Sequence, residues 1–477
     1  MDNFDPAQAF YLLATALFIL GIKRLGKVKT ARSGNQLAGV GMLLAIVVTL
    51  VSPGIGIQLD WTMVAIGLAI GASIGALMAR RVEMTGMPEL VALLNGIGGL
   101  ASTFVALSEF WGRKYGATIT PENVILGPDV WGVAVVLSIL VGTITFTGSL
   151  LAMAKLSGKI SGNPILLPMR HLLVAGSLLG GLALGYLAAF HQGSFDPAVM
   201  ILGLTACAAV FGVISVLPIG GADMPVVVSL LNSYSGIAAS MAGFVIGNPL
   251  LIVAGALVGA SGMILTIIMC KAMNRSLGNV LIGGFGGDAP TTGGASATEY
   301  ESVKSAGAEE AAMILDAATS VIFIPGYGMA VAQAQHVVKE LGEELESRDV
   351  TVRYGIHPVA GRMPGHMNVL LAESDVPYEQ LWELERINGD FKTTDVTVII
   401  GANDVVNPEA IENPQSPIAG MPILNAHESG TVLVIKRSLS PGYAGIKNPL
   451  FERGNCYMCF GDGKQFLTEI LAELKEN

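Results

Sequence analysis

Two glycines that directly follow an apolar run are the first residues of this sequence whose spacing suggests chemistry. Residues 321–324 read Val-Ile-Phe-Ile, and a Pro-Gly-Tyr-Gly turn with Gly326 and Gly328 leads into a helix-forming run. Dinucleotide-binding domains use the order strand, glycine turn, helix to bring backbone close to a pyrophosphate. The third position of the fingerprint is Val331, where glycine or alanine is usual. The stretch therefore predicts a nucleotide-binding site, although it matches the fingerprint at the first two positions and not at the third.

The ends of two other predicted strands favour NADP over NAD. An NAD site usually has an acidic residue at the end of the second strand, roughly 20–30 residues after the glycines. Here that strand ends in Gly-Ile-His-Pro at residues 355–358, without an acid. The strand at 432–435 is followed by Lys436, Arg437 and Ser438, a set suited to a dianionic 2′-phosphate. The alternative is a solvated basic pair.

Three further segments at predicted strand ends have the composition of site loops. Residues 359–365 combine glycines with Arg362, residues 401–408 contain Asn403 and Asp404, and residues 442–445 place Tyr443 between glycines as a lid. An ordinary surface loop is the alternative for each of them.

The sequence contains no serine elbow, no paired histidines for a metal and no P-loop. Hydride transfer needs none of these, because the cofactor carries the chemistry. Cys456 and Cys459 match a redox or zinc half-motif, but they lie in an apolar run that predicts a strand, and no second pair exists for a zinc ion. Since only one nucleotide site is present, either a partner delivers the second reactant or NADP(H) is a regulator.

Composition divides the chain into a membrane part and a soluble part. The mean hydropathy is +0.61, and only 13% of the residues are charged. Up to Leu277 there are 14 Lys/Arg against 10 Asp/Glu, and beyond it 13 against 27. The acidic second part is a poor binder of nucleic acid, so that class is set aside.

Nine apolar stretches predict nine membrane helices. They lie at 9–22, 36–55, 62–79, 89–108, 129–154, 171–190, 197–217, 225–247 and 249–271. Most Lys and Arg residues lie in every second loop between these stretches, and Arg113 and Lys114 are the exceptions. The positive-inside rule then places the N-terminus outside and everything after Lys271 in the cytoplasm.

Small and neutral polar residues dominate the predicted membrane helices. Glycines four residues apart, at Gly67–Gly75 and Gly255–Gly259, indicate close helix packing or oligomer contacts. Polar groups buried in lipid suggest function, although neutral ones also serve only to bond neighbouring helices. The candidates for a proton path are Asn95, Ser149, Asn232, Ser233 and Asp223.

The remainder predicts an α/β domain with a mostly parallel sheet. The expected domains are a membrane domain at 1–278, a flexible linker at 279–308 and a Rossmann-like domain at 309–477. The expected strands are 321–324, 352–356, 396–400, 422–424, 432–435 and 457–460.

The chain resembles the beta subunit of proton-translocating NAD(P) transhydrogenases along essentially its whole length. The resemblance rests on the run 325–335, on the loops above and on the membrane segments 219–229 and 231–236. It implies nine membrane helices followed by a Rossmann-like domain that binds NADP(H) in a reversed orientation. It also implies an alpha subunit that carries the NAD(H) domain and further membrane helices, two copies of each subunit, and a multi-pass location in the lipid of the cell inner membrane. Hydride would pass between NADH and NADP+, coupled to inward proton movement.

The resemblance also implies which residues contact NADP(H). Lys436, Arg437 and Ser438 would hold the 2′-phosphate, and His357 and Asp404 would link cofactor occupancy to protonation. The implied contacts are Tyr327, Val359, Ala360, Gly361, Arg362, Met363, Pro364, Gly401, Ala402, Asn403, Asp404, Val405, Gly420, Met421, Lys436, Arg437, Ser438, Leu439, Ser440, Pro441, Gly442, Tyr443, Asp462 and Gly463.

One departure concerns the proton path. Some members of the family have a membrane histidine where this chain has Asn95, which cannot carry a proton near neutral pH. We therefore expect the titratable residue to lie on the alpha subunit. The rival class is a transporter or channel gated by NADP(H) without turnover; an NAD-binding polypeptide encoded beside this one would favour the enzyme.

Overall fold

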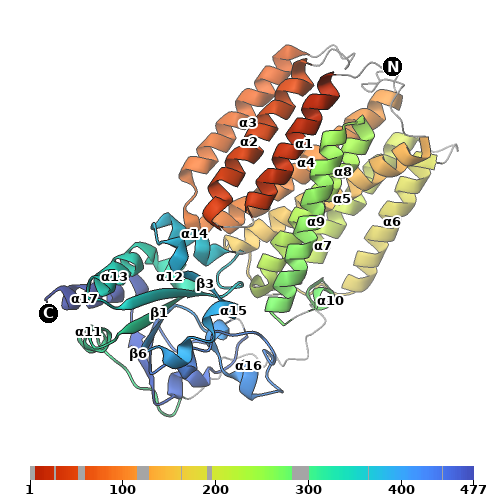
Figure 1. Cartoon of the computed structure of the whole chain (residues 1–477). Coiled ribbons are helices and arrows are strands. Elements are labelled where there is room, and N and C mark those ends of the chain that lie inside the picture. Colours follow the sequence, from red (N-terminus) through yellow and green to blue (C-terminus); the bar gives the residue numbers. More distant parts are fainter. Residues whose placement is uncertain are drawn as a thin grey trace. The chain divides into compact units, whose positions relative to one another are not determined.

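The structure is a computed structural model that describes residues 6–25, 28–51, 60–114, 128–162, 164–190, 196–274, 276–281, 300–363, 365–442 and 444–476. Contacts divide the chain into two compact units, Met1–Thr266 and Ile267–Asn477. Figure 1 shows a helical first unit and a second unit built on a sheet. Most of the predicted linker, residues 282–299, lies outside the described residues.

The first unit is a bundle of long apolar helices. Among the described residues, nine helices are long and apolar enough to cross a membrane, which confirms the predicted number of spans. They are α1 (Pro6–Leu25), α2 (Val28–Val51), α3 (Trp61–Arg81), α4 (Met87–Lys114), α5 (Pro128–Leu156), α6 (Arg170–Phe190), α7 (Pro197–Val216), α8 (Met224–Ile246) and α9 (Pro249–Ala272), whose last turn belongs to the second unit.

The helix ends follow local capping rules. Asp60 and Asp196 accept amide hydrogens at the starts of α3 and α7, and Gly247 ends α8 in the left-handed region with φ 65°. The start of α2 differs from the expected 36, because the helix begins at Val28 and includes Lys29 and Arg32. Both residues therefore lie near the start of α2, and the exposed Arg32 side chain can still reach the membrane surface.

Glycines bring the inner helices into backbone contact. A Cβ added to Gly99 on α4 would lie 2.6 Å from the carbonyl oxygen of Gly142 on α5, and one added to Gly255 on α9 would lie 2.4 Å from the amide nitrogen of Ser240 on α8. Gly255 therefore serves close helix packing, as its spacing predicted. Gly67, Gly71 and Gly75 on α3 have no described atom within 4 Å of an added Cβ, so the described part of this chain gives these three glycines no close packing partner.

The second unit is a six-stranded, fully parallel sheet with the strand order β3-β2-β1-β4-β5-β6. The strands are β1 (Ser320–Pro325), β2 (Thr351–Ile356), β3 (Leu381–Glu383), β4 (Val396–Ile400), β5 (Thr431–Lys436) and β6 (Cys456–Phe460). This is the order of dinucleotide-binding domains, and their ligands bind where the order reverses, between β1 and β4. The predicted fold class is confirmed.

Helices cover the buried strands on both faces, as a parallel sheet requires. Figure 1 shows α11 and α17 close to the strands at one end of the sheet. The helices of this unit are α10 (Leu277–Leu281), α11 (Ala308–Asp316), α12 (Tyr327–Ala332), α13 (Gln335–Ser347), α14 (His366–Glu373), α15 (Leu384–Ile387), α16 (Glu409–Glu412) and α17 (Gly463–Glu476). The strands β1 and β4 are buried along nearly their whole length.

One predicted strand was wrong. Residues 422–424 form no strand, and the edge of the sheet is instead the short β3. Pro422 has no amide hydrogen to give to a ladder, its carbonyl oxygen bonds His357, and the amide of Leu424 donates to Val405 O. The predicted strand around Cys456 and Cys459 is confirmed as β6, where burial raises the pKa of both free thiols to about 12.

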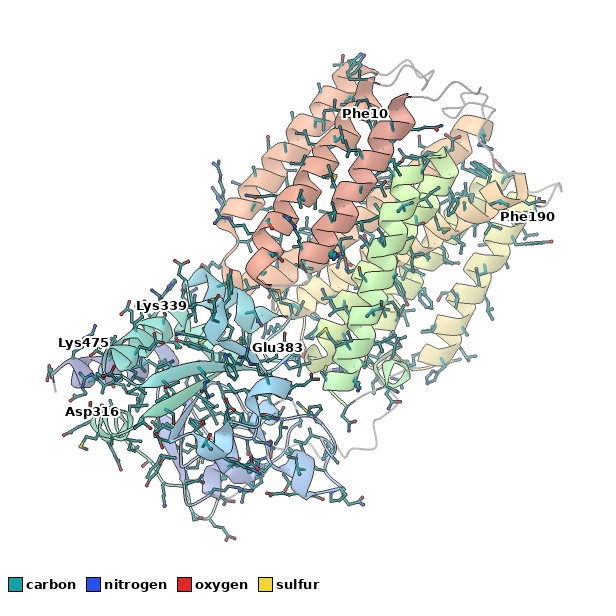
Figure 2. The ribbon with its side chains drawn as sticks, viewed as in Figure 1. Phe10, Phe190, Asp316, Lys339, Glu383 and Lys475 are labelled. Carbon is teal, nitrogen blue, oxygen red and sulfur yellow. The ribbon has the colours of Figure 1, made fainter. Side chains whose placement is uncertain are left out.

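The two units expose different side chains, as Figure 2 shows. Phe10 and Phe190 project from the helices of the first unit, where they expose 47% and 37% of their surface. In the second unit, charged side chains such as Lys339, Glu383 and Lys475 project outward. A lipid-facing surface and a water-facing surface are therefore segregated along the chain.

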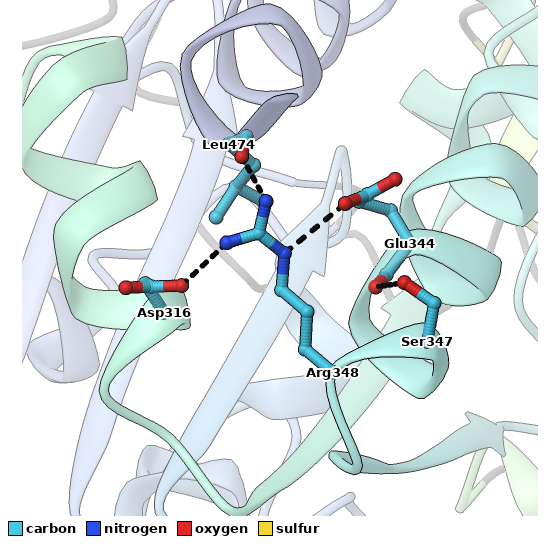
Figure 3. A network of polar contacts seen from close by, with 5 residues as sticks. All are labelled: Asp316, Glu344, Ser347, Arg348 and Leu474. Carbon is cyan, nitrogen blue, oxygen red and sulfur yellow. Dashed lines mark hydrogen bonds and ion pairs between the residues drawn. The ribbon is translucent and has the colours of Figure 1, made fainter. Parts of the chain in front are cut away.

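One arginine joins three helices of the second unit (Figure 3). The Arg348 guanidinium, just after α13, donates to Asp316 at the end of α11 with 2.7 Å and to Glu344 on α13 with 3.0 Å. It also donates to the carbonyl oxygen of Leu474 in the last turn of α17. A planar fork of donors suits this three-way contact better than an ammonium group does.

We expect Arg348→Ala to loosen the ends of α11 and α17, because both lose the same donor. Hydrogen–deuterium exchange of the full chain should show faster exchange in the last turns of both helices. Lys475→Ala, which removes an exposed cation from α17, is the control and should leave the exchange unchanged. Equal exchange in the Arg348→Ala variant and the wild type would contradict the assignment.

Candidate functional site

The loops after β1 and β4 touch each other through glycines. The amide of Gly326 donates to Ile400 O with 2.9 Å, and the amide of Gly328 donates to Gly401 O with 3.0 Å. A Cβ added to Gly328 would lie 2.6 Å from the Cα of Gly401, which has φ +64°. These glycines are therefore required for the contact between the two loops.

The glycine turn opens a short helix, and its amides are already used. The helix α12 has six residues and ends at Gln333, in the left-handed region with φ 49°. The amide of Met329 donates to Gly326 O, and that of Gly328 to Gly401 O. Because these two donors are bonded within the protein, the turn does not present them to a pyrophosphate as the usual fingerprint does.

His357, at the end of β2, is buried and bonded at both ring nitrogens. Its Nδ1 accepts from the amide of Val359 with 3.2 Å, so its Nε2 carries the hydrogen and donates to Pro422 O with 2.8 Å. Burial lowers the pKa of His357 to about 4, against a weaker opposing effect of the bond to Pro422. The imidazole is therefore neutral at physiological pH and ties the β2 loop to residue 422.

Tyr327, Arg362 and His366 form a cluster between the β1 and β2 loops. The Arg362 guanidinium lies 4.4 Å from the centre of the Tyr327 ring, and the rings of Tyr327 and His366 are 6.4 Å apart. The amide of Arg362 donates to Nδ1 of His366 with 3.0 Å. Gly361 has φ +103°, and an added Cβ would lie 2.5 Å from that nitrogen, so this position needs glycine.

The sequence analysis did not include His366. Its side chain is 1% exposed, and its Nε2 has no hydrogen-bond partner among the described residues. A buried polar atom without a partner needs an explanation such as a ligand or a water molecule. The available signal was its place at the start of a helix directly after the loop at 359–365.

Asp404, in the β4 loop, holds the segment that follows β5. Its Oδ2 accepts from the amide of Ala444 with 2.9 Å, and an added Cβ on Gly442 would lie 2.4 Å from its Oδ1. The neighbouring Asn403 donates to Ser440 O with 3.3 Å. The predicted loops after β4 and β5 are thus brought together.

Two cations and a hydroxyl follow β5 as expected. Lys436 Nζ donates to Ser440 O with 2.8 Å, and the hydroxyls of Ser438 and Ser440 are 2.9 Å apart. Burial lowers the pKa of Lys436 to about 8, opposed by the charge of Asp404. Arg437 is exposed and has no hydrogen bond or ion pair within the described residues. Tyr443 and Pro364 lie outside the described residues.

An apolar cluster joins four loops beneath these polar groups. Met421 is buried with Ile418 and Ile423, and Val359, Val405 and Ala444 pack against them. Gly420 precedes Met421 with φ +76°. Ala360 and Ala402 are also buried, so they belong to the floor of the loops rather than to their surface.

Asp462 and Gly463 lie directly after β6. The Oδ1 of Asp462 accepts from the amides of Lys464 and Gln465 with 3.1 and 3.3 Å, which makes Asp462 the N-cap of α17. Gly463 faces Ala332 at the end of α12. Both residues therefore have a structural role, since Asp462 caps α17 and Gly463 packs against the end of α12.

The membrane candidates are distributed over α4, α5 and α8. Asn95 donates to Val228 O with 3.3 Å, and Ser233 donates to Gly259 O with 2.6 Å, so both side chains bond neighbouring helices. Ser149 is fully buried, and its hydroxyl has no partner among the described residues. Asn232 is half-buried on α8, and Asp223 is buried directly before that helix. Their role in a proton path stays a prediction.

Comparison with known proteins gives one consistent result. The family model for the NAD(P) transhydrogenase beta subunit matches residues 7–473. The NAD(P) transhydrogenase subunit beta of Rhodospirillum rubrum is 48% identical over 470 residues, which cover 97% of this chain and 98% of the relative. The protein of the same name from a designated strain of that organism matches equally.

We expect His357 to make the stability of residues 300–477 depend on pH. Its folded pKa of about 4 lies below the ordinary 6.5, so only the unfolded chain binds the proton between these values. The free energy of unfolding should therefore fall by up to about 1.4 kcal/mol per pH unit as the pH drops from 6.5 towards 4. Urea unfolding of this segment, followed through the fluorescence of Trp382, measures the slope.

His357→Gln should reduce this pH dependence to the part that His366 and His427 contribute, whose pKa values burial also lowers, because the substituted side chain binds no proton in either state. His336→Gln is the control, since His336 is exposed on α13 and its loss should leave the slope unchanged. The same slope in the His357→Gln variant and in the wild type would show that His357 is not the buried neutral group described above.

Proposed function

Because the chain belongs to the NAD(P) transhydrogenase beta-subunit family, we propose that it is the NADP(H)-binding, proton-conducting subunit of the enzyme. In this function hydride passes between NADH and NADP+, and the transfer is coupled to inward proton movement. The observation that carries the proposal is the meeting of the β1, β2, β4 and β5 loops at the carboxyl edge of a sheet with the dinucleotide-binding order.

The 2′-phosphate of NADP(H) is assigned to the end of β5. Lys436, Arg437 and Ser438 supply two cations and a hydroxyl there, and the exposed Arg437 has no partner among the described residues that a phosphate would displace. Phosphate binding would also favour the charged form of Lys436, whose pKa burial has lowered to about 8. An NAD molecule lacks this anchor, so the site selects NADP(H).

The remaining implied contacts divide by position. Tyr327 and Arg362 supply an aromatic face and a guanidinium on the β1 and β2 side, and Asp404 holds the backbone of Ala444, beside the residues that would cover the ligand. When bound, NADP(H) supplies the hydride chemistry at its nicotinamide ring. The protein contributes orientation, and Asp404 and His357 are the groups assigned to coupling.

The partner is an alpha subunit that binds NAD(H) and adds membrane helices. This assignment accounts for the single nucleotide site found in the sequence of this chain. We place two alpha and two beta subunits in the complex, in the lipid of the cell inner membrane. The N-terminus lies outside and the second unit lies in the cytoplasm, because the loops with Arg80, Arg81 and Lys159 are the positive ones.

The domain boundaries stay those of the sequence analysis, 1–278, 279–308 and 309–477. Support comes from α9, which continues without a break to Ala272 across the division at residue 266. The proton path runs along Asn95, Ser149, Asn232, Ser233 and Asp223. Because Asn95 cannot titrate, the residue that carries the proton at mid-membrane depth is assigned to the alpha subunit.

The proposal predicts coupled turnover in membranes that contain the chain and its alpha partner. NADH should reduce an NADP analogue, and the internal pH should fall as protons move inward. Both signals should disappear without the alpha subunit. Cofactor binding without any turnover in the complete complex would instead support an NADP(H)-gated transporter or channel.

A second prediction concerns the phosphate site. The double substitution Lys436→Ala with Arg437→Ala should weaken NADP(H) binding by roughly 2–4 kcal/mol, because two charge-assisted contacts are lost. Titration calorimetry on the complex measures the change. Lys339→Ala with Lys475→Ala removes the same charge from α13 and α17 and should leave the affinity unchanged. An unchanged affinity in the first variant would mean that the 2′-phosphate lies elsewhere.

A further inference from the structure

Glu109 is a buried carboxylate inside a membrane helix, and the function described above does not use it. It lies on α4, five residues before the end of that helix at Lys114, and exposes 1% of its surface. Among the acidic residues of the described membrane helices, it is the one that is buried. Ionisable groups are costly at membrane depth, and those that persist there usually serve ion or proton pathways.

Glu109 continues a line of polar residues on α4. Asn95, Ser102 and Glu109 are seven residues apart, and a displacement of about 20° per seven residues keeps them on one face of the helix. All three are buried, with 8%, 6% and 1% of their surface exposed. A rise of 1.5 Å per residue places Glu109 roughly 21 Å from Asn95 along the axis. We call these three residues the polar line of α4.

The polar line lies where α4, α5 and α8 meet. Asn95 donates to Val228 O on α8 with 3.3 Å. The hydroxyl of Ser138 on α5 donates to Ser102 O with 3.1 Å and lies 3.4 Å from Ala238 O on α8. Glu109 thus lies at one end of a seam whose other end is Asn95, a residue already assigned to the proton path.

Two buried polar atoms without partners lie beside the two ends of this seam. The hydroxyl of Ser149 has none among the described residues, and its Cβ lies 3.0 Å from the Cβ position of Gly96, next to Asn95. The indole nitrogen of Trp131 also has none, and its ring stacks on Phe110, next to Glu109, at 6.5 Å. Buried donors of this kind are usually satisfied by ordered water.

Arg113 connects Glu109 with the surface. Its Nε lies 3.2 Å from Oε1 of Glu109, and its guanidinium lies 4.0 Å from the centre of the Trp131 ring. The Arg113 side chain is 35% exposed, so the pair reaches from a buried carboxylate to the end of the bundle. Arg113 thus compensates the charge of the buried carboxylate.

Few other titratable groups face Glu109. The helices that pack against α4 are α5 and α8. On α5 the titratable groups are Asp129, which is exposed near the same end, and Lys155 at the opposite end; on α8 there is only Tyr234. Among these described groups, Glu109 is the buried acid at its end of the seam.

We propose that Glu109 exchanges protons between the solution at the outer end of α4 and water molecules along the polar line. In each cycle its carboxylate takes one proton from water on one side and releases one to water on the other, so the carboxylate is regenerated and no electrons move. The inference rests on the proposed proton translocation and adds the step at the outer surface. The exchange at mid-membrane depth remains assigned to the alpha subunit.

The test uses the complete complex in sealed vesicles, with an internal pH dye and a separate assay of hydride transfer. Glu109→Gln should lower proton flux and coupled hydride transfer at least about 10-fold, while the affinity for NADP(H) stays unchanged. Glu109→Asp should retain flux. Glu109→His should move the pH of half-maximal flux upward, because an imidazole titrates at a higher pH than a carboxyl group.

Asp129→Asn is the matched control, since it removes an exposed carboxylate at the start of α5 and should change nothing. Wild-type flux in the Glu109→Gln variant would overturn the inference. If that variant does not assemble, identical pH profiles for the wild type, Glu109→Asp and Glu109→His would overturn it as well. A wild-type complex without hydride transfer would contradict the proposed function instead.

Discussion

The candidate nucleotide site depends on one steric constraint, the contact of two backbones at the point where the strand order reverses. Gly326 and Gly328 after β1 lie against Gly401 after β4 with no room for a Cβ. Because β1 and β4 are the central strands, this contact sets the distance between the two halves of the sheet edge. The loops with Arg362 on one side and Asp404 on the other take their positions from it.

The membrane unit uses the same principle for a different purpose. Glycines such as Gly99 and Gly142 let α4 and α5 approach until backbones touch, and Asn95 and Ser138 bond across the junction with α8. Close packing of this kind leaves little space, so the few buried polar atoms without partners become informative. In both units a small residue allows two backbone segments to approach each other, and polar side chains nearby then form the hydrogen bonds.

Sequence reasoning was sufficient where a pattern is local and failed where a position depends on the fold. Long apolar runs predicted the membrane helices, and Lys436–Ser438 could be placed at a strand end because β5 is an apolar, mostly β-branched run. The three-residue β3 has no such pattern, and Pro422 was assigned to a strand although it has no amide hydrogen to donate to a ladder. Glu109 was overlooked because a carboxylate near a helix end looks exposed, and only the packing of α5 and α8 shows that it is buried. His366 was missed because its orphan nitrogen is a property of its surroundings.

The parallel strand order also determines when the second unit can form. Val321 on β1 pairs with Val396 on β4, 75 residues later in the chain, and no neighbour on that side is available before β4 is synthesised. At about 5–20 residues per second, translation of the intervening segment takes roughly 4–15 s. During that interval the apolar β1 and β2 have been made while one edge of β1 remains open. The ribosome therefore leaves an unpaired, aggregation-prone strand edge open for seconds in every copy, and the acidic composition of this unit favours the solubility of the unfinished chain.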